Sequence, residues 1–202
     1  MKLTDSQRDW LTLTLVPGVG TARFIKLLAR FQEPKRILSA SQAALAQVVG
    51  PKLAERIKTY QEVSNVEVQE RLLNQYDASL LTLEDVDYPA ALAEIYDPPL
   101  VLFKRGALHG SDANAVAIVG TRNPSAYGER MAEELAAALV VRGITVVSGL
   151  AAGIDAAAHR GALEAGGRTI AVLGCGVDLV YPSQNAELMH RIVQQGCVVS
   201  PF

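Results

Sequence analysis

The chain has 202 residues, half of them hydrophobic, and a mean hydropathy of +0.18. Lys and Arg number 19 against 21 Asp and Glu, a formal net charge of −2. The length allows one large or two small globular domains, and the overall charge does not by itself indicate a nucleic-acid-binding protein.

The charge is unevenly distributed along the chain. Residues 1–60 hold 10 basic and 4 acidic side chains, a net of +6. Residues 61–113 hold 3 basic and 10 acidic, a net of −7, and residues 114–202 hold 6 and 7, a net of −1. A positive head on a neutral body indicates either one surface that faces a polyanion or ordinary solvated helix faces.

The N-terminus and the cysteines bear on the compartment. No apolar h-region follows Met1, and no apolar run approaches spanning length, so we expect a cytoplasmic protein without signal peptide or anchor. Cys175 and Cys197 both border apolar strands and are expected to be buried free thiols.

Residues 4–75 are expected to be wholly helical. Asp5 or Ser6 can cap a first helix that runs through Leu15, and Thr21 can cap a second one after a glycine turn. A similar unit follows, with a helix over Ala43–Val48, a Gly50-Pro51 turn and a helix from Lys52.

The first glycine turn, Pro17-Gly18-Val19-Gly20, resembles the hairpin of helix-hairpin-helix modules, in which backbone N–H groups approach a DNA phosphate. The alternative is an ordinary αα-hairpin whose turn needs glycine. The functional reading predicts a secondary DNA contact at Gly18, Gly20, Arg23, Lys26 and Lys52.

Residues 77–113 form a connector between the helical domain at 1–76 and an α/β domain at 114–202. Ser79–Leu83 and Leu100–Phe103 are expected to be strands, added to the sheet as edge strands or a flap, and Tyr88-Pro89 opens a short helix through Ile95. The polar loop at 110–114 is the clearest boundary.

The α/β domain alternates strands and helices. Strands are expected at Val116–Val119, Ile144–Val147 and Thr169–Leu173; Ser125 caps a helix through Val141, and another helix begins near Gly153. Apolar strands joined by such helices predict a parallel sheet, with three glycine-bearing loops at one edge. That edge is the usual ligand crevice of an open α/β sheet, and an anion is the expected ligand.

The loop residues fit phosphate binding. The glycines allow close backbone approach, the hydroxyls donate hydrogen bonds, and Arg122 supplies a fixed positive charge. The candidates are Gly120, Thr121, Arg122, Ser125, Gly128, Ser148, Gly149 and Gly153. Arg122 could instead pair with Glu129 or Glu133.

Four more residues have two interpretations each. Asp155 and His159 are i, i+4 neighbours. They could form a catalytic general-base pair or two metal ligands, but a structural hydrogen-bonded pair is favoured. Tyr127 and Tyr181 could stack on bases or plug the sheet edge.

Known catalytic motifs are missing. The first turn, Gly120-Thr121-Arg122-Asn123-Pro124, is not GxGxxG, residues 114–202 contain no lysine for a P-loop, and Ser148 lacks a preceding glycine for a nucleophile elbow. We therefore expect no catalytic residue, cofactor or metal. The alternative is an enzyme that binds nucleoside phosphates, such as a phosphoribohydrolase, but the Pro-Gly-Gly-x-Gly-Thr loop of those enzymes is absent from the sequence.

Several ordered motifs together resemble the DNA-processing protein A family, also called DprA or Smf. They cover essentially the whole chain, and they are the connector from Tyr88-Pro89 to Gly106, Gly120-Thr121-Arg122 with Tyr127-Gly128, the run from Ser148 to Asp155 with His159, the strand from Thr169 to Gly174, and Tyr181-Pro182 with Asn185.

The resemblance implies a Rossmann-like, mostly parallel sheet with a small all-α N-terminal domain of helix-hairpin-helix or SAM-like type. It implies a homodimer without known catalysis that binds single-stranded DNA, protects incoming strands in natural transformation and passes them to the RecA recombinase. The DNA pocket carries over to Gly120, Thr121, Arg122, Ser148, Gly149 and Gly153, with Asp155 and His159 beside them.

One feature departs from the family. There the fourth strand leads into Ser-Glu and a further part of the sheet with an Arg-Asn-Arg motif, whereas this sequence reads Val198-Val199-Ser200-Pro201-Phe202. We expect a fragment or a natural truncation with an incomplete sheet, an apolar edge exposed unless the connector strands cover it, and weakened dimerisation and DNA affinity.

Overall fold

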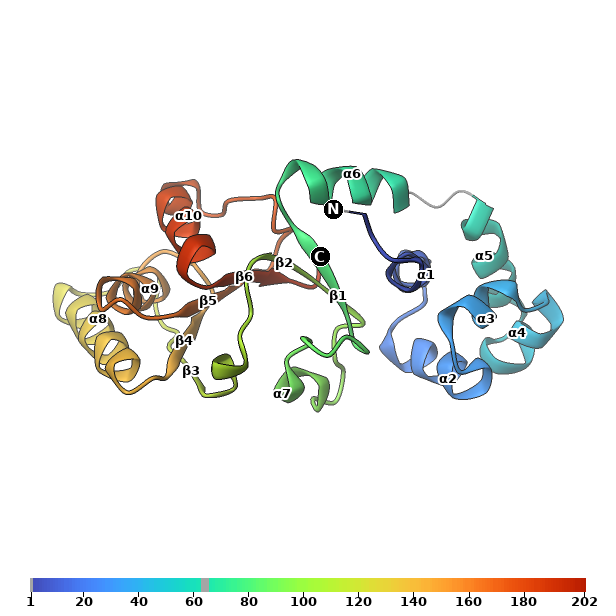
Figure 1. The fold of residues 1–202 in the computed structure, drawn as a ribbon, viewed down its shortest axis with the longest axis horizontal. Helices are drawn as coiled ribbons and strands as arrows, with labels where there is room; N and C mark the ends of the chain where they lie inside the picture. The colour runs from blue at the N-terminus through green and yellow to red at the C-terminus, as the bar shows by residue number, and fades with distance from the viewer. Residues whose placement is uncertain (1, 63–65) are drawn as a thin grey trace. The chain divides into compact units, whose positions relative to one another are not determined.

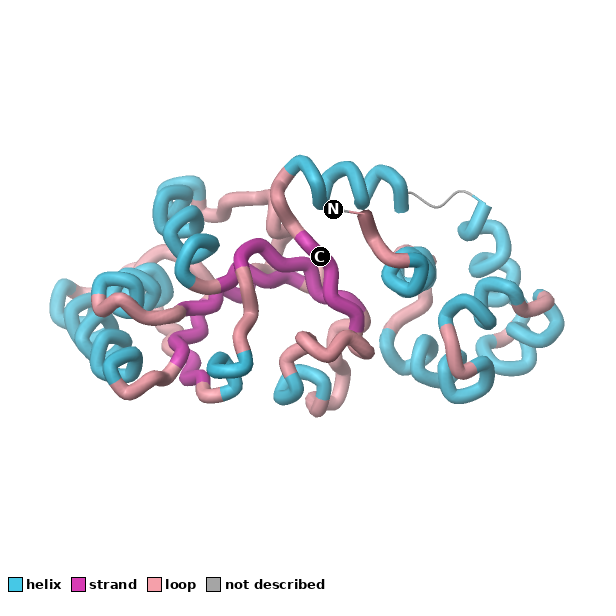
Figure 2. Tube along the Cα trace, viewed as in Figure 1, coloured by secondary structure: helices cyan, strands magenta, loops and turns pink. Residues whose placement is uncertain are grey.

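The computed structural model describes residues 2–62 and 66–202. The chain folds into two units, one of residues 1–76, 80–88 and 92–101, the other of residues 77–79, 89–91 and 102–202. Every described strand comes from residue 79 onward, whereas the described part of residues 5–75 contributes helices (Figure 2). Within the described ranges, each helix is too short or too polar to cross a bilayer.

Six helices form most of the first unit. They are α1 (Asp5–Thr14), α2 (Thr21–Phe31), α3 (Pro34–Ser39), α4 (Gln42–Val49), α5 (Pro51–Glu62) and α6 (Val66–Gln75). Their apolar faces meet around Trp10, whose ring stacks on Phe24 with centroids 4.6 Å apart. Both rings are fully buried, so this pair fixes the α1–α2 hairpin.

The helix starts differ from the predicted ones by a residue. The Thr4 side chain, not Asp5 or Ser6, caps α1, because its oxygen accepts a hydrogen bond from the Gln7 N–H while the Gln7 side chain accepts from the Thr4 N–H. Gly20, not Thr21, is the N-cap of α2, and no side chain caps that helix.

Six strands form one mixed sheet of order β1-β2-β6-β5-β4-β3. They are β1 (Ser79–Thr82), β2 (Val101–Gly106), β3 (Ala115–Ala117), β4 (Thr145–Ser148), β5 (Thr169–Val172) and β6 (Cys197–Ser200). The last four run parallel in chain order, and β2 joins β6 antiparallel, with Phe103 opposite Ser200. The predicted mostly parallel α/β sheet is confirmed, and the connector supplies added strands.

Three long helices cover one face of the parallel strands (Figure 1): α8 (Ala126–Val141), α9 (Ile154–Glu164) and α10 (Ala186–Gln195). Short elements lie between strands: α7 (Ala90–Ala93), η1 (Gly110–Ala113) and η2 (Ser183–Asn185). The predicted helix from Tyr88 through Ile95 is thus a single turn.

Small residues let α8 and α9 approach closely. Ala136, Ala158 and Ala162 are fully buried between them, and a Cβ on Gly161 would collide with the backbone of Glu133. The first turns of α8 and α9 are also neighbours, because a Cβ on Gly128 would lie 3.7 Å from the Ile154 side chain, and both helices begin after loops at one edge of the sheet.

The sequence left open whether the fourth parallel strand would be an exposed edge or would be covered by a connector strand. The connector strand β2 pairs with β6 and covers it. The described sheet ends at β1 on one side, where most residues are buried, and at β3 on the other, where all three residues are exposed.

Candidate nucleic-acid interface

A pocket of about 330 Å³ lies where the loops after β3, β4 and β5 meet. Because these strands are parallel, their carboxyl ends share one edge of the sheet, as predicted. The first loop contributes Arg122 to the pocket wall, and the rest of the wall is Gly149, Ala151, Ala152, Leu173, Gly174, Cys175, Tyr181 and Pro182.

Gly153 holds the first two loops together. It has φ +83, and a Cβ there would overlap the carbonyl oxygen of Thr121 and lie 2.8 Å from the carbonyl of Arg122. The next residue, Ile154, donates its N–H to the Thr121 carbonyl at 3.2 Å. Only glycine fits this backbone conformation and this contact, so the sequence fixes the position of Arg122 beside the start of α9.

The Asp155 carboxylate links the loops after β3 and β4 through hydrogen bonds. Its Oδ1 accepts a hydrogen bond from the Gly120 N–H at 3.3 Å, and its Oδ2 accepts one from the Gly149 N–H at 3.0 Å. Asp155 is 7% exposed. Both glycine N–H groups therefore have a protein acceptor, although Gly149 still lines the pocket, and the binding of a phosphate at Gly120 and Gly149 stays a prediction.

Two other predicted site residues lie in the core. The Ser148 hydroxyl donates to the Ile118 carbonyl at 2.6 Å and is 2% exposed, so it does not face a ligand. His159 is fully buried, with Nδ1 2.7 Å from the Thr169 hydroxyl, and does not bond Asp155. The expected Asp155–His159 pair is thus wrong, since each side chain has other partners.

Burial dominates the electrostatics of His159. Desolvation lowers its pKa to about 4, outweighing the Ser148 backbone, which favours the charged ring. The Thr169 hydroxyl donates its own proton to the Val146 carbonyl, so the histidine ring donates from Nδ1. His159 is therefore a neutral structural residue beneath the pocket loops.

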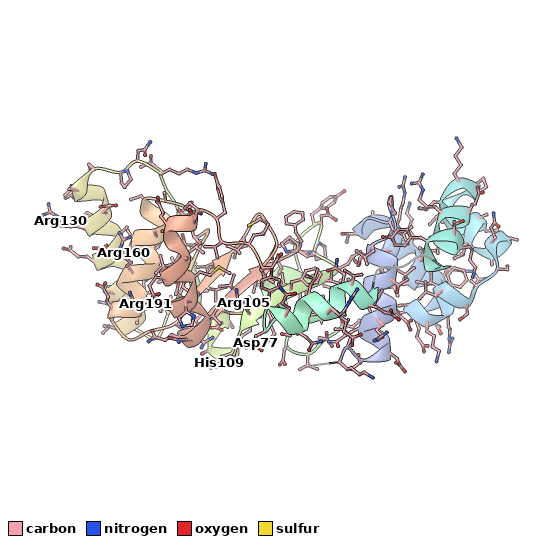
Figure 3. All side chains as sticks on the ribbon, turned by 90° about the horizontal axis from the view of Figure 1, so that it is seen from above. Asp77, Arg105, His109, Arg130, Arg160 and Arg191 are labelled. Atoms are coloured by element: carbon pink, nitrogen blue, oxygen red, sulfur yellow. The ribbon has the colours of Figure 1, made fainter. Side chains whose placement is uncertain are left out.

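Arg122 is the free cation of the pocket. The alternative partners Glu129 and Glu133 both face Arg160 on α9 instead, at 4.0 and 3.0 Å, and Figure 3 shows Arg160 in this part of the molecule. Among the described residues Arg122 has no ion pair or side-chain hydrogen bond, and it is exposed. A guanidinium left without a protein partner at a pocket wall is available to an anionic ligand.

The predicted hydroxyl and tyrosine residues differ in whether they are available to a ligand in the pocket. The Ser125 hydroxyl caps α8 by accepting a hydrogen bond from the Gly128 N–H at 3.2 Å, so the Gly128 N–H already has a protein acceptor. The Thr121 hydroxyl accepts one from the Asn123 N–H. Tyr127 and Tyr181 are each 67% exposed, so neither plugs the sheet edge. Tyr181 lines the pocket, whereas Tyr127 does not.

Sequence reasoning left several pocket residues out of the site. Ala151, Ala152, Gly174 and Cys175 line the pocket through their backbone or small side chains. Asn185 supports them, because its buried amide donates to the Leu150 carbonyl at 2.8 Å. The glycines of the loop after β5, Gly174 and Gly176, were the sequence signal that could have placed this loop in the site. Cys175 is only half-buried, contrary to expectation, while Cys197 is buried, and both are free thiols.

The predicted secondary DNA contact belongs to the first unit. Gly18 has φ +98 in the exposed turn between α1 and α2, and Gly20 caps α2. Arg23 and Lys26 lie exposed on α2, and Lys52 lies exposed on the first turn of α5.

The sheet, its layer of helices and the pocket at the carboxyl ends of the strands define a Rossmann-like α/β protein. The chain belongs to the DNA recombination-mediator protein A family, whose sequence model matches residues 79–202.

Individual relatives agree with this assignment. Protein Smf of Synechocystis is 40% identical over 98% of the chain and 51% of its own length, and a putative DNA processing protein DprA of Mycobacterium tuberculosis is 35% identical over 90% and 53%. The chain spans about half the length of these curated relatives.

Two solved structures are also similar. DNA processing protein A from Streptococcus pneumoniae has a TM-score of 0.78 and 30% identity, covering 100% of this chain and 69% of that one. The protein from Helicobacter pylori, described for its single-stranded DNA binding mode, has a TM-score of 0.55 and 34% identity, covering 62% and 55%.

Proposed function

We propose that the pocket binds the phosphate backbone of single-stranded DNA. The observation that carries the proposal is Arg122, an exposed guanidinium at the pocket wall that no carboxylate of the described chain neutralises. Membership of a DNA-processing family and the binding described for the Helicobacter pylori protein support the choice of ligand.

Backbone amides add to this cation. No protein acceptor faces the N–H groups of Arg122, Ala152 or Gly174 within the described residues, and Ala152 and Gly174 line the same pocket. These contributions are small individually, so the charge of Arg122 dominates the binding of a phosphate.

Exposed aromatic surface lies beside the cation. Tyr181 lines the pocket with two thirds of its surface exposed, and a base can stack on such a ring. An arginine next to an exposed tyrosine suits a flexible single strand, in which phosphate and unpaired base alternate, better than a small anion alone.

Fluorescence anisotropy with a labelled single-stranded oligonucleotide tests the proposal. Affinity should fall with salt along a log–log slope of about −0.7 for each phosphate neutralised. Arg122→Ala should weaken binding roughly tenfold for all sequences and make the slope shallower by about 0.7, because one charged contact is lost.

Arg142→Ala is the matched control for this experiment. Arg142 caps the opposite end of α8 and is exposed, and its side chain donates only to the Ala138 carbonyl. The Arg142→Ala change therefore removes the same charge as Arg122→Ala, but at the end of α8 that lies about 24 Å along the helix from the pocket. Equal affinities of the Arg122→Ala variant and the unaltered protein would remove the pocket from DNA binding.

The wider role is also a proposal, supported by family membership. A DNA recombination mediator of this kind would act in the cytoplasm, protect incoming strands in natural transformation, load RecA and act as a homodimer without catalysis of its own. Nuclease protection of a bound oligonucleotide and RecA-dependent strand exchange measure these activities. Release of free base from nucleoside monophosphates would instead favour the phosphoribohydrolase alternative.

A further inference from the structure

The turn between α1 and α2 presents backbone to solvent. Val16 and Val19 anchor it in the core at 2% and 6% exposure, whereas Pro17, Gly18 and Gly20 are exposed. The Val19 N–H donates to the Val16 carbonyl at 3.0 Å, which closes the turn around Gly18. The hydrophobic anchors therefore hold the exposed backbone rigidly.

Two arginines from different helices grip this turn. Arg23 of α2 donates from Nη1 to the Gly18 carbonyl at 2.7 Å, and Arg56 of α5 donates from Nη1 to the Pro17 carbonyl at 2.7 Å. A Cβ added to Gly18 would lie 3.1 Å from the Arg56 nitrogen and 3.6 Å from the Arg23 nitrogen. Two guanidinium groups thus flank one glycine; we call this pair the arginine clasp.

The arginine clasp has no protein counter-ion. Within the described residues no carboxylate lies at ion-pair distance from Arg23 or Arg56, whereas Arg8, Arg160 and Arg168 each face one. Two like charges at this separation repel each other, and one anion between them would relieve the repulsion. Each guanidinium also keeps N–H donors that no protein acceptor takes up.

The surroundings of the clasp are basic. Lys26 lies one turn after Arg23 on α2, and Lys52 lies one turn before Arg56 on α5, and both are exposed. The N–H groups of Thr21 and Ala22, in the first turn of α2, have no acceptor among the described residues. The surface therefore offers positive charge and backbone donors on both sides of the turn.

We propose that the arginine clasp binds a phosphodiester of a DNA backbone, as a second contact separate from the pocket. The proposal takes its ligand from the proposed function but uses different residues in the other unit of the chain. Its recognition chemistry is charge and hydrogen bonding to phosphate, so it should accept single and double strands alike.

The double variant Arg23→Gln/Arg56→Gln tests the proposal, since glutamine can still donate to a turn carbonyl but carries no charge. Anisotropy should show roughly tenfold weaker binding to single- and double-stranded oligonucleotides, with a single-strand salt slope shallower by about 0.7, the value for one phosphate. Arg71→Gln, which removes one arginine charge at an exposed position on α6, is the control and should leave both quantities unchanged.

A second variant covers the case in which the first unit loses its fold. Lys26→Ala/Lys52→Ala removes two exposed charges that make no side-chain hydrogen bond among the described residues, so thermal unfolding should be unchanged. This variant should also weaken DNA binding several-fold and make the salt slope shallower. Full affinity in both double variants would overturn the proposal.

The outcomes for the two sites can be told apart. Loss of binding in Arg122→Ala, with full binding in both the Arg23/Arg56 and the Lys26/Lys52 double variants, would support the pocket and overturn the clasp. Loss in the clasp variants with full binding in Arg122→Ala would retain the clasp and overturn the pocket. Binding of phosphatidylserine vesicles, in place of oligonucleotides, that depends on the clasp would assign this surface to membranes and overturn the proposal.

Discussion

Asp155 accepts a hydrogen bond from the backbone N–H of Gly149, with Oδ2 3.0 Å from the nitrogen. The other carboxylate oxygen accepts the N–H of Gly120, so one buried side chain at the start of α9 joins two loops that the chain brings together from 29 residues apart in sequence (120 to 149). A carboxylate suits this position because it offers an acceptor to each amide and no donor.

Asp155→Asn should therefore loosen the pocket. The amide keeps one acceptor but turns an NH₂ group toward the other backbone N–H, leaving a buried donor unpaired at a cost of about 1–3 kcal/mol. We expect urea unfolding to show this loss and anisotropy to show weaker binding of single-stranded DNA.

Glu164→Gln provides the control for Asp155→Asn, because it makes the same chemical change at an exposed position near the end of the same helix. It should change the free energy of unfolding by less than about 0.5 kcal/mol. An Asp155→Asn variant as stable as this control would show that the carboxylate does not hold the loops.

Gly153→Ala should displace the first loop. The added Cβ meets the Thr121 carbonyl, and the residue must also adopt φ +83. Gly143→Ala is the matched control, because Gly143 has φ +74 with nothing within 4 Å of its Cβ position. The control should lose about 1 kcal/mol from backbone strain alone.

The difference in stability loss between Gly153→Ala and Gly143→Ala measures the effect of the contact with the Thr121 carbonyl, separately from backbone strain. We expect Gly153→Ala to lose at least 1 kcal/mol more than Gly143→Ala, since overpacking adds about 1–3 kcal/mol. Only Gly153→Ala should weaken DNA binding, because Arg122 follows the displaced carbonyl. Equal losses of stability and unchanged binding in both variants would contradict the role given to Gly153.

Local signals predicted much of this architecture. Ser125 is the cap of α8 and Gly153 the start of α9, as their sequence positions indicate. The hydrogen-bond partners of the loop N–H groups could not be predicted from the sequence, because Asp155 reaches Gly120 only after β3, α8, β4 and α9 have packed together. Ser148 shows the same limit: strand alternation does not say that its hydroxyl turns inward to the Ile118 carbonyl.

His159 should make stability depend on pH. Its pKa is about 4 in the folded chain, because burial disfavours the charged ring, against an ordinary value of 6.5. Between these values the unfolded chain binds a proton that the folded chain does not, so the free energy of unfolding falls as pH falls from about 6.5 to about 4. The loss is on the order of 3 kcal/mol.

His159→Gln should remove most of this dependence, because glutamine can donate to the Thr169 hydroxyl but does not titrate in this range. Urea unfolding at several pH values between 4 and 7 measures it. His190→Gln, at an exposed position on α10, is the control and should keep the loss of stability toward pH 4. An unchanged pH profile in His159→Gln would assign the dependence to other groups.

Tyr181 and Tyr127 give a matched test of base stacking, because both are 67% exposed but only Tyr181 lines the pocket. Tyr181→Ala should weaken binding of single-stranded DNA by about 1–3 kcal/mol if a base stacks on its ring, and Tyr127→Ala should weaken it less. Thermal unfolding should be nearly unchanged in both, since neither ring is buried. An abasic oligonucleotide separates stacking from charge: the Tyr181→Ala effect should disappear with it, whereas the Arg122→Ala effect should persist. Equal weakening by both tyrosine variants, or a Tyr181→Ala effect that survives on the abasic strand, would rule out stacking at this pocket.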